Sequence, residues 1–104
     1  MRKIIGGKVY DTDKASLVCD ISPIGLYQGD FAYEDTSLYK TSKGTFFIAG
    51  EGGPRSRWAQ PDGTNGMRSG SGVALVDEDE ARALCERHGT EQAFVDAFGE
   101  PEEG

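Results

Sequence analysis

The sequence predicts a small α+β domain in which a mostly antiparallel sheet packs against two or three short helices. A chain of 104 residues with 37% hydrophobic residues can bury one modest core. Runs rich in aromatic residues and threonine occupy its middle, as in strands, and the apolar spacing near its C-terminus is helical. We therefore expect one domain over residues 1–99 and an acidic, flexible tail over residues 100–104.

The N-terminal run RKIIGGKVY surrounds Gly6 and Gly7 with apolar residues. Glycine reaches positive φ without steric cost, so this run predicts a short strand or a tight hairpin. The next stretch, DTDKASLVCDI, offers Asp11 or Thr12 as an N-cap and predicts a short helix. The apolar residues on or near one face of that helix are Ala15, Leu17, Val18 and Ile21.

The prolines and glycines of residues 22–30 predict a break in regular structure, and the clearest hairpin follows over residues 31–52. Gly44 suits the left-handed position of its turn. The apolar positions shift between Tyr33 and Leu38, which indicates a β-bulge. The side chains that we expect this hairpin to place in the core are Phe31, Tyr33, Leu38, Tyr39, Phe46, Phe47 and Ile48.

Residues 50–72 are rich in glycine, which predicts a long connection, and residues 71–77 then resemble one more strand. Two helices close the chain, one beginning at Asp77 and one at Thr90. The first has a buried stripe at i, i+3, i+4 and i+7, formed by Ala81, Leu84, Cys85 and His88. The predicted order of elements is β-α-β-β-β-α-α.

No catalytic, metal or cofactor site is predicted, and we expect no enzyme. His88 is the single histidine and ends a helix, where an imidazole suits the dipole. Two cysteines and one histidine without CxxC or HxxxH spacing do not indicate a metal site. The run GEGGPRSRW lacks the Lys-Ser/Thr of a P-loop, so its glycines are expected in backbone turns. We expect Trp58 to cover a sheet edge, with Arg55 and Arg57 flanking it. An enzyme or ligand-binding module centred on residues 50–58 is the alternative.

Cys19 and Cys85 both fall in segments that are predicted to be helical, and we expect two buried free thiols in a reducing cytosol. The chain has no apolar run long enough for a signal peptide or a membrane span. These features predict a cytoplasmic protein that makes no membrane contact.

The net charge of −7 is confined to the C-terminal part of the chain. Residues 1–76 contain nine Lys and Arg and eight Asp and Glu, a net +1, whereas residues 77–104 contain two and ten, a net −8. Negative charge repels nucleic-acid backbones and anionic lipids, and it attracts proteins whose basic surfaces bind such polyanions. A protein partner is therefore favoured over direct nucleic-acid or membrane binding.

Some of these acids have local roles. Asp77 and Glu80 have the spacing of an N-cap and its partner three residues later, and Glu91 lies in the first turn of the second helix. Others project away from the buried stripe, and Asp79 and Glu86 lie about 10.5 Å apart along their helix axis. On spacing alone, a solvated helix surface is the simpler interpretation. It leaves unexplained why so much like charge gathers at one end.

Four motifs carry a family resemblance: K-x-Y-D-T-x-x-A, L-Y-x-T-x-x-G-x-F-F, G-x-G-G-P-x-S-x-W, and a charged helix rich in Glu and Ala. In this order and spacing, over about residues 3–98, the chain resembles a family of small acidic proteins of phages, prophages and conjugative elements. Some members look like anti-CRISPR proteins that inhibit type I systems. The chain departs from the pattern in its polar insertion at residues 62–71 and in its two cysteines.

The resemblance implies an inhibitor that occupies a DNA-binding surface of a type I CRISPR effector (Cascade) in the bacterial host. Such effectors read DNA with Arg and Lys clusters, which fixed carboxylates can engage. The alternative is a small mobile-element adaptor or regulatory protein that uses the same acidic face on another basic partner. The residues that we expect to bind the partner are Asp77, Glu78, Asp79, Glu86, Asp96, Glu100, Glu34 and Asp35, the last two if they face the same side.

Overall fold

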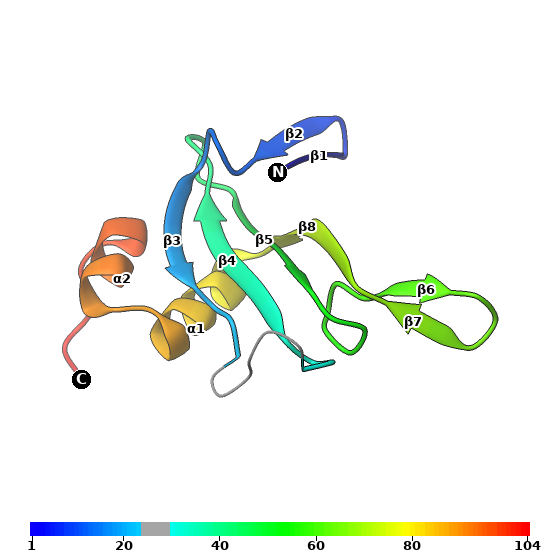
Figure 1. Ribbon diagram of the computed structural model, residues 1–104. Helices are drawn as coiled ribbons and strands as arrows, with labels where there is room; N and C mark the ends of the chain where they lie inside the picture. Colours follow the sequence, from blue (N-terminus) through cyan, green and yellow to red (C-terminus); the bar gives the residue numbers. More distant parts are fainter. Residues whose placement is uncertain (24–29) are drawn as a thin grey trace.

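A four-stranded antiparallel sheet is the centre of the computed structural model, which describes residues 1–23 and 30–104 (Figure 1). Its strands lie in the order β3 (Ser16–Asp20), β4 (Glu34–Lys40), β5 (Phe46–Gly52) and β8 (Gly70–Val76). Two separate hairpins pair β1 (Arg2–Ile5) with β2 (Lys8–Asp11) and β6 (Gln60–Asp62) with β7 (Gly66–Arg68). Helices α1 (Glu78–His88) and α2 (Glu91–Phe98) follow. The predicted α+β class with antiparallel sheets is confirmed.

The N-terminal hairpin forms at the predicted glycine pair. Gly6 and Gly7 have φ of 59° and 80°, and the strands on either side pair in register from Arg2 with Asp11 to Ile5 with Lys8. Two successive residues of positive φ match the right-handed twist of hairpin strands, and only glycine adopts them without strain.

The helix predicted over residues 11–21 is wrong. One turn does form, because the Asp11 carbonyl accepts the N–H groups of Lys14 and Ala15. The chain then extends into β3, whose pairing with β4 begins at Ser16 opposite Lys40. Backbone bonds to a neighbouring strand here outweigh a local helical pattern, as tertiary context commonly does. Cys19 consequently lies on a strand.

The β4–β5 hairpin is confirmed, with Gly44 at φ 88° in its turn. Its seven residue pairs run without a shift in register, so the bulge predicted between Tyr33 and Leu38 is wrong; the irregularity lies in β3, between Leu17 and Cys19. The apolar positions looked shifted because Tyr33 lies before the first residue of β4 and does not take part in its alternation. The predicted break over residues 22–30 falls mostly outside the described residues.

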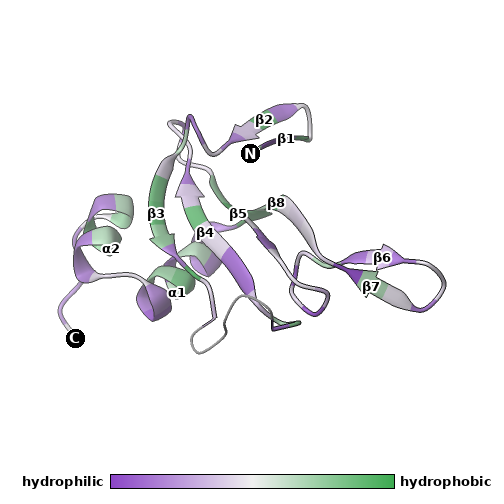
Figure 2. Ribbon diagram, in the orientation of Figure 1, coloured by the Kyte–Doolittle hydropathy of each residue, from purple (hydrophilic) through white to green (hydrophobic). Residues whose placement is uncertain are grey.

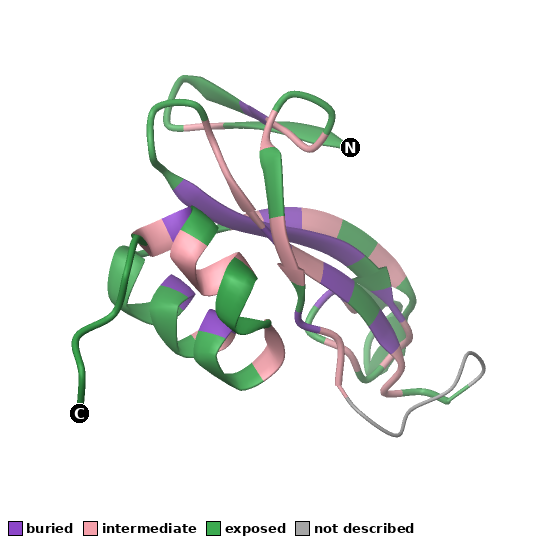
Figure 3. Cartoon of the chain, turned by 90° about the vertical axis from the view of Figure 1, so that its left-hand side faces the viewer, coloured by how far each residue is buried: buried purple, intermediate pink, exposed green. Residues whose placement is uncertain are grey.

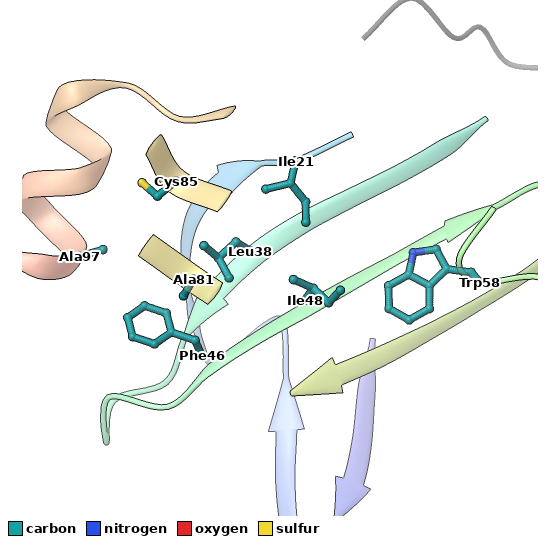
Figure 4. Close-up of a cluster of buried hydrophobic side chains, with 8 residues drawn as sticks. All are labelled: Ile21, Leu38, Phe46, Ile48, Trp58, Ala81, Cys85 and Ala97. Carbon is teal, nitrogen blue, oxygen red and sulfur yellow. The ribbon is translucent and has the colours of Figure 1, made fainter. Parts of the chain in front are cut away.

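Alternation along the central strands creates two hydrophobic clusters on opposite faces of the sheet. The helices cover one face and the N-terminal hairpin approaches the other (Figure 3). The helix-side cluster consists of Ile21, Leu38, Phe46, Ile48, Trp58, Ala81, Cys85 and Ala97 (Figure 4). The hairpin-side cluster consists of Tyr10, Phe47, Ala49 and Val73. Phe31 was expected in the core, but it is 65% exposed because it lies before β4.

Aromatic contacts hold the covering elements on the sheet. Phe46 stacks on Phe98 of α2 with ring centroids 5.0 Å apart, and Phe47 meets Tyr10 of β2 edge-on at 5.7 Å. Lys40 donates from Nζ to the Ala97 carbonyl at 2.7 Å, which places a cation at the C-terminal end of α2 where the dipole favours it. The last turn of α2 is thus bonded to β4 as well as packed on β5.

The glycine-rich segment over residues 50–72 was predicted to be a long connection, but it contains β6 and β7. This small hairpin extends away from the main sheet, and its strand residues are all exposed (Figure 1). Gly50 and Gly52, expected in turns, belong to β5. Their role is close packing: a Cβ at Gly50 would lie 2.2 Å from the Asp35 carbonyl oxygen.

Cys19 and Cys85 are both free thiols, as predicted, and they face each other between β3 and α1; Cys85 is buried, whereas Cys19 is only half-buried. Burial raises the pKa of the Cys19 thiol from 9.0 to about 11, and burial also raises the pKa of Cys85. Both groups therefore stay protonated at neutral pH and pack as small apolar side chains.

Replacing Gly50 tests the close packing of β4 on β5. Gly50→Ala should lower the free energy of unfolding by roughly 1–3 kcal/mol, because the new methyl group meets backbone atoms that cannot move aside. Urea denaturation followed by circular dichroism measures the change. Gly104→Ala, where no atom lies within 4 Å, is the control and should change nothing. Equal stability of the two variants would contradict this packing.

The raised pKa values of the two thiols predict that the stability of the fold depends on pH. A thiol whose pKa is raised in the folded state stabilises the fold below its unfolded pKa and loses that contribution as pH rises through the folded value. The wild type should therefore lose stability between about pH 9 and about pH 11. Urea midpoints across this range should fall less for Cys19→Ala than for the wild type. Identical falls would show that Cys19 ionises equally in both states.

Candidate functional site

The two helix starts have the predicted caps. Asp77 accepts the N–H of Glu80 at 2.8 Å, and Thr90 accepts the N–H of Ala93 at 3.1 Å. Each cap satisfies a backbone donor that the helix leaves unpaired, and Asp77 also places negative charge at the positive end of the α1 dipole. These two bonds fix where α1 and α2 begin, and so fix which side chains face outward.

Ten carboxylates, all exposed, make up what we call the acidic surface. Hydrophilic and apolar positions alternate along both helices, and the apolar ones pack on the sheet (Figure 2). The members of the acidic surface are Asp77, Glu78, Asp79, Glu80, Glu86, Glu91, Asp96, Glu100, Glu102 and Glu103.

Little of this charge is neutralised. Within residues 77–104, all of which the structure describes, one carboxylate has an ion-pair partner: Glu78 meets Arg82 at 3.4 Å, four residues along the helix. An exposed pair of this kind contributes only about 0.3–0.5 kcal/mol. Asp79 and Glu86 project from the side of α1 opposite the buried Ala81 and Cys85, as predicted from their spacing.

On α2, Asp96 is exposed and accepts a hydrogen bond from the Gln92 amide at 2.8 Å. A neutral amide orients the carboxylate without cancelling its charge. The neighbouring Ala97 is buried against the sheet, which directs Asp96 outward. Asp96 therefore keeps a full charge in a defined position.

The C-terminal segment returns towards the helices. Pro101 shares a shallow hollow of about 240 Å³ with Glu86 at the end of α1 and with Glu91 at the start of α2. The segment after Gly99 has no helix or strand, and its residues are exposed. Pro101 thus lies beside Glu86 and Glu91, and the exposed glutamates on either side of Pro101 in the sequence add to the negative charge at this end of the chain.

Glu34 and Asp35 do not join this surface. They are consecutive on β4, so their side chains point to opposite faces of the sheet. Glu34 is 6% exposed and bonded internally, whereas Asp35 is exposed beside Glu51, on the face that carries the N-terminal hairpin. The condition attached to their prediction, that both face the side of the helix acids, is not met.

Glu34 instead belongs to a buried polar network that the sequence did not indicate. The Trp58 indole donates from Nε1 to Thr36 Oγ1 at 2.8 Å, and Thr36 Oγ1 donates to Glu34 Oε2 at 2.7 Å. Arg57 completes the network with Nε 2.9 Å from Glu34 Oε2. The charge of Glu34 is therefore paired and hydrogen-bonded, as a buried carboxylate requires.

Two residues of the glycine-rich loop over residues 50–58, Arg57 and Trp58, belong to this network. Trp58 is 8% exposed and packs on the helix side of β8, where a Cβ at Gly72 would lie 3.0 Å from its ring. It therefore covers the face of this edge strand, and not the edge itself as predicted. The Arg57 Nε and the Trp58 indole N–H both bond inside the protein, although part of the Arg57 side chain reaches solvent. Arg55 is exposed, and its side chain bonds to none of the described residues. Arg57 and Trp58 therefore serve the fold, whereas Gly52, Gly53 and Pro54 line a hollow of about 420 Å³, and a ligand-binding module at residues 50–58 stays a prediction.

Across residues 1–23 and 30–104, no three His, Cys, Asp or Glu side chains lie where they could share a metal ion. No helix in the same ranges is both long and apolar enough to cross a membrane. Comparisons with protein-family models, curated proteins and solved structures found no match to the chain. The acidic surface is the feature of the described residues that most favours a function.

Removing Arg57 tests the buried network. Arg57→Ala leaves the Glu34 carboxylate buried without its cation, so the free energy of unfolding should fall by about 1–3 kcal/mol. Arg55→Ala is the matched control, because the Arg55 side chain is exposed and lies outside the network, and it should change stability by less than about 0.5 kcal/mol. Chemical denaturation measures both, and equal effects would contradict the internal role of Arg57.

Proposed function

We propose that this protein is a non-enzymatic inhibitor that binds the basic, DNA-binding surface of another protein through its acidic surface. One observation carries the proposal: ten exposed carboxylates and only two arginines lie in residues 77–104, on two capped helices and the tail that follows them. Helix capping accounts for a few of these acids. Concentrating the remainder at one end costs stability through repulsion, which a positively charged partner would relieve.

The spacing of the outward acids suits such a partner. A DNA duplex presents one negative charge per roughly 1.7 Å of its axis, and the proteins that bind it align Lys and Arg clusters with that array. Asp79 and Glu86, about 10.5 Å apart along α1, engage two separate cations, and Asp96 adds a third position from α2. Because these carboxylates stand on folded helices, the protein loses little conformational entropy on binding.

The partner is the DNA-binding surface of a type I CRISPR effector. By occupying this surface, the protein prevents the effector from binding target DNA and recognising its PAM. The choice of this partner rests on the sequence resemblance to small acidic proteins of mobile elements. The acidic surface supports it, because its carboxylates can bind the Lys and Arg clusters of such an effector. A mobile-element adaptor that binds a different basic protein through the same surface is the competing function. Recovery of another host protein and no effector subunit in a pull-down would favour the adaptor.

Charge reversal tests the surface directly. The triple variant D79K/E86K/D96K should lose competition with target DNA for a purified type I effector, because it replaces three outward anions with cations. The control D13K/D35K/D62K reverses three exposed acids away from the helices and brings the net charge to the same value, −7 + 6 = −1. It should compete as the wild type does.

Wild-type competition should weaken as salt concentration rises, since the contacts are electrostatic. If both triple variants lost competition with target DNA equally, the effect would belong to net charge and not to the acidic surface. If the effector bound DNA unchanged at saturating wild-type protein, the proposal would be overturned. Phage plaquing on hosts with different type I systems, with and without this gene, then identifies the subtype that is inhibited.

A further inference from the structure

Strand β8 forms an edge of the main sheet and has an open side. Among the described strands it pairs with β5 alone, through seven residues in unbroken register, and β1 approaches it but pairs only with β2. Its sequence, GSGVALV, contains no charge and no proline. An edge strand of this kind presents a row of backbone donors and acceptors that can pair with another strand.

The opposite edge of the same sheet is built differently. Strand β3 is shorter, its register with β4 is broken between Leu17 and Cys19, it ends in Asp20, and α2 packs beside it. A short strand, an irregular register, a charge and a covering helix are the means by which natural sheets prevent edge pairing. The protein protects one edge and leaves the other available.

We propose that β8 is a self-association surface, and that two copies of this chain pair antiparallel along it to form one continuous eight-stranded sheet. A two-fold axis at Val73 sets the register. Ser71 of one copy lies opposite Leu75 of the other, and Gly70 opposite Val76. Gly70 and Gly72 accommodate Trp58 of their own chain on one face of the strand. Ser71 and Ala74 are small and uncharged, so neither hinders the approach of a second backbone.

The charges at the two ends of β8 favour a second copy as the occupant. Arg68 precedes the strand and Asp77 and Glu78 follow it, so an antiparallel pair brings the basic end of each copy to the acidic end of its partner. Opposite charges at facing positions stabilise strand pairs, whereas a parallel pair would place like charges together. The strand is thus complementary to itself in one direction only.

The like-charged helices do not oppose this pairing. In this register the two Val76 residues lie six positions apart along the paired strands, which separates the starts of the two α1 helices by roughly 20 Å. That distance exceeds the Debye length of about 8 Å at physiological ionic strength. Because the axis is perpendicular to the sheet, both helix layers lie on the same face of the dimer. Asp77 and Glu78 lie near the second copy's Arg68, whereas Asp79 and Glu86 of α1 and Asp96 of α2 remain outward.

Two double variants that share one substitution test the register. S71K/L75K places lysine opposite lysine at two points of the interface, whereas S71K/L75E places lysine opposite glutamate. Ser71 is exposed and lies beside Glu51 on β5, so the lysine introduced there has a favourable neighbour within its own chain in both variants. Leu75 is 44% exposed, which makes both replacements at this position tolerable for the fold.

Size-exclusion chromatography with light scattering at high micromolar concentration gives the readout, and circular dichroism verifies folding. We expect a dimer for the wild type, monomer for S71K/L75K, and recovery of the dimer for S71K/L75E. A monomeric wild type would overturn the proposal, and so would a dimer that both variants leave intact or that both abolish while remaining folded. The helix acids are unchanged in every variant, so DNA competition by the monomeric variant separates this proposal from the inhibitory one.

Discussion

The register between β4 and β5 determines where nearly every other group in the protein lies. Seven uninterrupted pairs place Phe46 towards the helices and Phe47 towards the N-terminal hairpin, so a single pairing supplies the centre of both hydrophobic clusters. The same alternation turns Glu34 inward and Asp35 outward. A shift of one residue would exchange the two faces and bury the wrong set of side chains. The rest of the fold is attached to this hairpin.

The acidic surface depends on that hairpin through the helices. Phe46 holds α2 by stacking on Phe98, and Lys40 from the neighbouring strand bonds the last turn of the same helix. Ala81 and Cys85 seat α1 on the sheet, and small side chains at these points bring the helix axis close. Charge and packing are therefore divided between opposite sides of each helix. Reversing an outward carboxylate leaves these contacts untouched.

Sequence patterns predicted the structure best for elements that depend on interactions between residues close together in the chain. Glycine pairs, cap residues and apolar spacing located the N-terminal hairpin, the β4–β5 turn and both C-terminal helices, because each depends on interactions within a few residues. The helix predicted around Leu17 was wrong because its helical spacing competed with a strand partner more than twenty residues away. The outward acids of α1 followed from helix geometry, but the place of Glu34 did not. Arg57 meets Glu34 only in the folded chain, and Trp58 is linked to it through Thr36.

The main sheet is covered unequally along its length. Two helices cover the end near Phe46, whereas at the far end the helix side is covered by Trp58, held over Gly72 by the hydrogen bond to Thr36 (Figure 4). Trp58 is also the only tryptophan of the chain. Its fluorescence therefore reports on one end of the sheet, while far-ultraviolet dichroism reports mainly on the helices at the other. Two spectroscopic signals can thus establish whether the ends of this sheet unfold together or one before the other.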